Sequence, residues 1–209
     1  SPHRLSNRQQ LRNHSRMSAF FGVSQAPSET SADAQAVIAA LAGLRRFSAL
    51  GYDLHGVVAH GSTGVAARKE FGHVEHLSQL VEQFPLEGCA CLGQAQWSMG
   101  GQLDLPGAFP RPTKRLSLVF KGLVSNLNSL RNHLTESMVG RVDADAGEVL
   151  INYASLVLEE EGTPQRALVR LMDEIKGAFA LGAMFHEEDG LILASQKDAE
   201  LYLGHLNEG

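Results

Sequence analysis

The residue types that most often carry chemistry are present in this chain, but their spacing supports no self-contained metal or cofactor site. Cys89 and Cys91 are separated by one residue, too short a span to be bridged without strain. A zinc site needs about four ligands. His73 and His76 share a helical spacing, but no second Cys or His cluster is suitably spaced to complete such a set. We therefore expect neither a metal nor a cofactor.

The composition of the chain argues against some classes of binding partner. The chain has 209 residues, 44% hydrophobic and 20% charged, which suits one ordinary globular domain. A net charge of −5 provides no basic surplus to neutralise phosphates, so we expect no nucleic-acid partner. The longest apolar runs, residues 36–44 and 178–185, are too short to span a bilayer, so no membrane partner is expected. The two cysteines fit reduced thiols in a cytoplasmic protein.

Residues 1–16 differ from the rest of the chain. They contain no acidic residue and carry arginines at positions 4, 8, 12 and 16, which would repel one another on a helix. We interpret them as a disordered leader, either an added tag or an upstream extension, with Met17 as a native start. A transit peptide is the alternative. Residues 17–209 are expected to form one domain.

Apolar periodicity predicts the elements that would position a site. Helical spacing indicates helices at residues 34–47, 74–84, 126–135, 146–160 and 165–175. Strands are predicted at 19–23, around Val57, and at 65–68, 89–97, 116–120, 178–185, 191–194 and 201–204, with a long loop over 100–112. Strands at both ends with helices between them indicate an α+β or a layered α/β protein.

The sequences of several segments resemble those of a known protein family. Residues 36–61, AVIAALAGLRRFSALGYDLHGVVAHG, resemble the first helix and strand of the class II glutamine amidotransferase domain, as in the N-terminal half of glucosamine-6-phosphate synthase. QAQW at 94–97 stands where the family has His-Thr-Arg-Trp, and GAFPR at 107–111 where it has Asn-Ala-His-Pro-His. The match continues to the chain end, slightly short of the family's domain end. It implies the N-terminal-nucleophile hydrolase fold, an α+β four-layer α/β/β/α sandwich with two antiparallel sheets.

The resemblance also assigns catalytic positions, and this chain departs from them. The family's nucleophile is an N-terminal Cys whose own amine acts as the base. Ser18 stands at that position, and a hydroxyl is a weaker nucleophile than a thiol. With Met17 attached, Ser18 has no free amine. Lys121 and Gly122 stand where the family's Asn and Gly form the oxyanion hole.

The positions that resemble the glutamine-binding residues are altered as well. Gln96 replaces the Arg that grips the substrate carboxylate, and it lacks the charge and the bidentate fork. Trp97 is retained, as a packing residue or as a substrate contact. Ala146 aligns with the Asp that holds the substrate amine, a role that Asp145 could take after a shift of register.

These departures lead to three interpretations. The first is a pseudo-glutaminase that serves as a binding, regulatory or assembly module. The second is an active amidotransferase or amide hydrolase that uses Ser18 after processing and supplies ammonia to a sugar-phosphate aminotransferase domain. The third is a structural remnant that stabilises a larger assembly. Expected partners are a sugar-isomerase-like domain or protein, and glutamine or a small acidic metabolite in a vestigial pocket. Lys121, if it is not simply a solvated charge, would attract such an anion.

Overall fold

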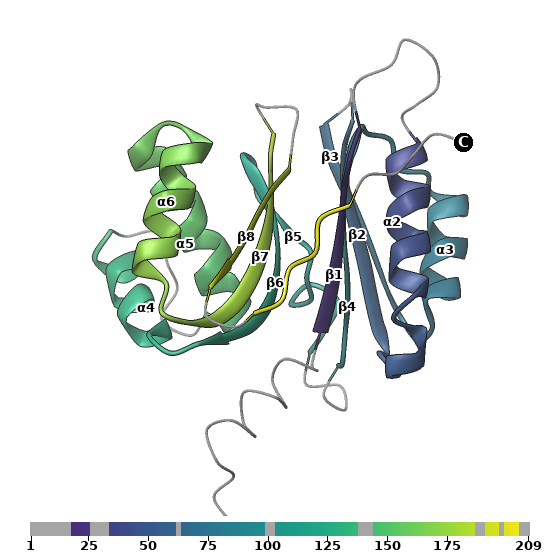
Figure 1. The fold of residues 1–209 in the computed structure, drawn as a ribbon, viewed down its shortest axis with the longest axis horizontal. Coiled ribbons are helices and arrows are strands. Elements are labelled where there is room, and N and C mark those ends of the chain that lie inside the picture. Colours follow the sequence, from purple (N-terminus) through teal and green to yellow (C-terminus); the bar gives the residue numbers. More distant parts are fainter. Residues whose placement is uncertain are drawn as a thin grey trace, which may run out of the picture.

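The described residues form four layers, two β-sheets packed face to face with helices on both outer surfaces (Figure 1). The computed structural model describes residues 18–25, 34–61, 64–98, 103–137, 144–186, 191–196 and 199–204. Both sheets are antiparallel throughout their described pairings. The predicted α/β/β/α sandwich is therefore confirmed. The predicted leader and Met17 lie outside the described residues.

The first sheet has the strand order β1-β4-β2-β3. Its strands are β1 (Ser18–Ser24), β2 (Leu54–Gly61), β3 (Gly64–Phe71) and β4 (Ala90–Gln96). Two helices, α2 (Gln35–Arg45) and α3 (Val74–Gln83), cover its outer face. Alternate side chains of β2 divide between the two faces. Val57 and Ala59 pack beneath the helices, whereas Val58 points toward the second sheet.

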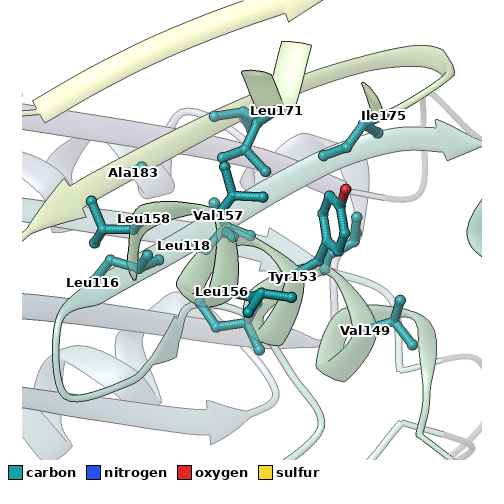
Figure 2. Close-up of a cluster of buried hydrophobic side chains, with 14 of the residues drawn as sticks. Leu116, Leu118, Val149, Tyr153, Leu156, Val157, Leu158, Leu171, Ile175 and Ala183 are labelled. Carbon is teal, nitrogen blue, oxygen red and sulfur yellow. The ribbon is translucent and has the colours of Figure 1, made fainter. Parts of the chain in front are cut away.

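The second sheet has the order β5-β6-β7-β8. Its strands are β5 (Arg111–Pro112), β6 (Leu116–Val124), β7 (Gly177–Phe185) and β8 (Leu191–Gln196). The helices α4 (Leu127–Glu136), α5 (Ala146–Glu161) and α6 (Pro164–Glu174) cover it. Figure 2 shows the core between them, where aliphatic side chains of α5 and α6 meet those of β6 and β7.

A smaller apolar cluster joins the two sheets. Its buried members come from β2, β4, β6 and β7, and they are Val58, Ala90, Leu92, Val119 and Met184. Because strand side chains alternate with a period of two, every second residue of these strands points into this layer. Polar residues at the same phase therefore face the opposite sheet.

Two predicted elements need correction. The predicted strand at 201–204 is wrong, because this segment pairs with no described strand and its Tyr202 and Leu203 side chains are more than 80% exposed. The predicted loop over 100–112 ends in the two-residue strand β5. Elsewhere in the described chain the predicted helices and strands are found within a few residues of their expected bounds. No helix in this described part is long and apolar enough to cross a membrane.

Candidate functional site

Ser18 and Gln96 lie side by side at one end of the first sheet. They are direct partners in the β1–β4 ladder, and Gln96 also pairs with Leu54 of β2. Ser18 is 9% exposed, and its Oγ lies 3.5 Å from the carbonyl oxygen of Phe120 on β6. That carbonyl belongs to the peptide group leading into Lys121. The structure thus brings together three positions that the resemblance selected, at what is called here the Ser18 end.

Gln94 connects the two sheets at this end through two hydrogen bonds. Its Nε2 donates to the Phe120 carbonyl at 2.7 Å, and its Oε1 accepts from the Phe120 N–H at 2.9 Å. The edge strand β5 pairs with β6 only at Ser117 and Leu118. The Gln94 amide therefore satisfies the main chain of β6 beyond the point where β5 ends. Gln94 is 1% exposed, so these two bonds are fully shielded from water.

Gln96 binds the loop that precedes β5. Its Nε2 donates to the Phe109 carbonyl at 2.9 Å. The two preceding carbonyls are held in the same way, Ala108 by Lys69 Nζ at 2.6 Å and Gly107 by the Arg111 guanidinium. Three consecutive carbonyls of the loop are thus bound by three side chains. The Gln96 amide, which the resemblance predicted at a carboxylate-binding position, is engaged with its own chain.

Glycine permits the same loop to lie directly on β2. A Cβ at Gly56 would stand 2.7 Å from Pro110 Cδ and 3.0 Å from the Phe109 oxygen, closer than real Cβ contacts allow. The loop therefore packs against the main chain of Gly56, which pairs with Gln94 on one side and Lys69 on the other, and a side chain at position 56 would displace it.

Lys69 has an unusual electrostatic environment. Burial lowers its pKa to about 8, and the neighbouring Arg111 guanidinium adds to this effect, while Asp104 opposes it. Its ammonium is held by a carbonyl dipole instead of a carboxylate within ion-pair distance. Lys69 was not predicted from the sequence, since an isolated lysine in the strand GVAARKEF gives no signal of burial.

Lys121 and Gly122 lie on β6 beside Ser18. Gly122 has φ +126°, and a Cβ there would stand 2.3 Å from the Ala178 oxygen, so the position requires glycine. Lys121 is half-buried. It lies two residues after Val119, which belongs to the cluster between the sheets, so it points to that side. Within the described part of the chain, Lys121 has no hydrogen-bond or ion-pair partner.

Asp145 and Ala146 begin helix α5. Asp145 is the N-cap, and its carboxylate accepts from the Glu148 N–H at 2.9 Å. It also accepts from Arg111 Nη2 at 2.8 and 3.0 Å. Burial opposes ionisation, but these donors outweigh it and lower the pKa of Asp145. The carboxylate is therefore ionised and already bound, whereas Ala146 offers no polar group.

Trp97 is anchored away from these residues. Its Nε1 donates to the Gly51 carbonyl at 2.9 Å, and its ring lies 5.8 Å from that of Tyr52. The side chain is 38% exposed. These contacts fix the turn between α2 and β2 against the end of β4.

The cysteines and histidines form no second site in the described part of the chain. Both cysteines are free, and burial raises the pKa of Cys91 to about 12, so its thiol stays protonated. No described group of three or more His, Cys, Asp or Glu residues could hold a metal ion.

The chain is similar to known proteins over most of its length. The chain is 27% identical over 165 residues to the glutamine–fructose-6-phosphate aminotransferase (isomerizing) of Bradyrhizobium diazoefficiens. It is 28% identical over 166 residues to that of Bartonella quintana, and each match covers 79% of the chain. These similarities support the class II glutamine amidotransferase domain that the sequence resembles. It spans 27% of the length of each of these two relatives. No family model matches the chain.

Solved structures agree on the fold. A glutamine phosphoribosylpyrophosphate amidotransferase from B. subtilis superposes with a TM-score of 0.64 at 20% identity, covering 87% of this chain and 38% of its own. An allosteric regulatory enzyme of purine biosynthesis superposes with a TM-score of 0.60 at 20% identity, covering 81% and 35%. The N-terminal-nucleophile hydrolase fold, expected from the sequence, is confirmed.

Proposed function

We propose that this glutaminase-type domain does not hydrolyse glutamine and serves as a binding, regulatory or assembly module. The observation that carries the proposal is the state of Gln96. It occupies the position that grips the substrate carboxylate, and its amide donates to the Phe109 carbonyl instead. Losing a charge-assisted contact costs about 1.5–3 kcal/mol of binding, before the cost of breaking that internal bond.

The groups expected to attack and to polarise the amide support the same conclusion. Ser18 offers a hydroxyl whose nearest polar contact is a carbonyl, which cannot accept its proton as a base would. Lys121 stands where an amide donor would complete the oxyanion hole. Removing one such donor typically costs about 10²–10³ in rate. Losses among residues that act together are not additive, yet each of them alone is severe.

The carboxylate that could bind the substrate ammonium group is also engaged within the domain. An amino-acid substrate needs an acceptor for its ammonium group. The Asp145 carboxylate is bound by Arg111 and by the Glu148 N–H. Recruiting it for a substrate would leave the Arg111 guanidinium, 9% exposed, without its counter-ion.

The relatives suggest the context in which such a module acts. The matched proteins are named glutamine–fructose-6-phosphate aminotransferases, and the chain corresponds to 27% of their length. We propose that the domain associates with a sugar-phosphate isomerase-like domain, on the same polypeptide or on a second one. Its role would then be to stabilise or regulate that partner.

Glutamine hydrolysis tests the proposal. Ammonia release from L-glutamine is measured for the full chain and for a chain trimmed to begin at Ser18, which has the free amine that catalysis requires. We expect neither to release ammonia above the rate of buffer alone. Release by the trimmed chain that disappears in its Ser18→Ala variant would overturn the proposal and establish the alternative, a serine-dependent amidotransferase or amide hydrolase supplying ammonia to such a partner.

A further inference from the structure

Lys121 is a half-buried cation whose charge no described residue neutralises. The other described basic side chains near the Ser18 end are engaged, Arg111 with Asp145 and Lys69 with the Ala108 carbonyl. Lys121 makes neither kind of contact within the described part of the chain. A partly buried charge is costly unless it is paired. An anion bound beside Lys121 would supply the missing counter-charge.

The surroundings of Lys121 define the chemistry of that anion. The Ser18 hydroxyl lies 3.5 Å from the Phe120 carbonyl, whose peptide group leads into Lys121. This distance is the long limit of a hydrogen bond, so the hydroxyl is free to donate elsewhere. An ammonium and a hydroxyl carried by facing strands of the two sheets would together suit a group with two or three acceptor oxygens. A neutral amide would leave the charge uncompensated.

Two acceptors that could bind Lys121 or Ser18 are already bound by other donors. The Phe120 carbonyl is already bound by Gln94, and the Asp145 carboxylate by Arg111 and the Glu148 N–H. This carbonyl and this carboxylate are thus engaged by other donors. An external oxyanion is the group that would satisfy both Lys121 and Ser18.

We propose that Lys121 and Ser18 bind the oxyanion of a small acidic ligand, a carboxylate or a phosphoryl group, at the place where the glutaminase relatives carry their nucleophile. This inference rests on the proposed loss of glutaminase activity, because a bound oxyanion would occupy the position of the attacking group. The ligand would act by stabilising the Ser18 end, where β1 faces β6.

Binding is tested on the full chain with three probes, glutarate, its neutral diamide glutaramide, and inorganic phosphate. Titration calorimetry and melting temperature are measured for the wild type and for Lys121→Met. Lys114→Met, which removes an exposed lysine before β6, is the matched control. We expect glutarate or phosphate, and not glutaramide, to bind the wild type and the control. We expect Lys121→Met to weaken binding about ten-fold or more, and added salt to weaken binding in the wild type.

Binding of glutarate would indicate a carboxylate ligand, and binding of inorganic phosphate would indicate a phosphoryl ligand. Equal affinity of wild type and Lys121→Met for both anions, or no binding of either anion, would overturn the inference. Retained folding of Lys121→Met is checked by its circular dichroism spectrum and by its melting temperature without ligand. Ammonia release from L-glutamine, assayed separately on the wild type, decides the proposed function independently of this result.

Discussion

Two regions of this domain lie on opposite faces of β6 and are stabilised by different kinds of interaction. On its outer face, side chains such as Phe120 and Phe179 stack at 5.4 Å beneath α5 and α6 in an apolar core. On the face toward the first sheet at the Ser18 end, amide side chains bind main-chain groups. The first region depends on burial and shape, and the second on directional hydrogen bonds. The comparison shows that apolar packing holds the outer face of β6, whereas polar side chains at the Ser18 end bind main-chain groups of the same domain.

The largest effect is expected in the apolar region. Phe179 is fully buried, and Phe179→Ala should destabilise the domain by about 3–5 kcal/mol through lost burial and a residual cavity. Urea unfolding measures the change. Val169→Ala on the exposed face of α6 is the control and should change stability by less than about 0.5 kcal/mol. A similar small effect for both variants would contradict the assigned core.

The second prediction concerns a substitution that removes hydrogen bonds from the polar region. Gln94→Leu removes the amide donor to the Phe120 carbonyl and the acceptor for the Phe120 N–H, and leaves the carbonyl only the long contact with the Ser18 hydroxyl. Each unpaired buried group costs about 1–3 kcal/mol, so we expect a total loss of about 3 kcal/mol in urea unfolding. Gln94→Glu keeps the acceptor but not the donor, and should lose less at low pH, where the carboxyl is protonated and can donate. If Gln94→Leu were as stable as the wild type, the Gln94 bridge between the sheets would be refuted.

The third prediction concerns the neighbouring glutamine. Gln96→Leu leaves one carbonyl, that of Phe109, without its donor, and we expect a cost of about 1–2 kcal/mol. Because this bond also fixes the loop before β5, amide hydrogen exchange in residues 107–112 should accelerate in the variant. Unchanged exchange there would show that Lys69 and Arg111 hold the loop without Gln96.

How much of this could be predicted from the sequence depended on the range of the interactions. Helix α3 follows from the apolar spacing of Val74, Leu77 and Val81 alone. The bridge made by Gln94 could not be found, because its partner Phe120 is 26 residues away and contributes only main-chain atoms. A visible hint was the placement of two glutamines, 94 and 96, on one face of an otherwise apolar strand.

The predicted strand at 201–204 failed for the same reason. Apolar residues suggested a strand, but a strand also needs a partner with free main-chain groups, and this segment pairs with no described strand. Asp145 could be located in the sequence by resemblance. Its hydrogen bond to Arg111 could not be predicted, because the two residues are brought together only by the fold.

The smallest expected effect is a pH dependence at the opposite end of the region between the sheets. There His186 stacks on His60 at 5.4 Å, and its ring nitrogens contact Ser117 Oγ and the Lys114 carbonyl. Burial lowers the pKa of His186, and the charge of His60 adds to this effect, although the Lys114 carbonyl opposes it. The unfolded chain therefore binds the proton more readily, and stability should fall as pH drops through about 6.5 and below.

Urea unfolding at pH 8 and pH 5 measures this dependence. His186→Gln, which keeps a polar group, should reduce the loss of stability at pH 5 by less than about 1 kcal/mol. The two bonds between Gln94 and the Phe120 main chain contain no titrating group, so the effect of Gln94→Leu should be nearly the same at both pH values. Identical pH dependence in wild type and His186→Gln would refute the contribution of His186.

The central claim is that the amide of Gln96 serves the fold and not a substrate. A crystal structure of the chain trimmed to Ser18, grown with saturating L-glutamine, tests it most directly. The account predicts that Gln96 Nε2 still donates to the Phe109 carbonyl and that no glutamine amide lies within reach of Ser18 Oγ. A bound glutamine gripped by Gln96, with its amide carbon beside Ser18 Oγ and the free amine, would contradict it.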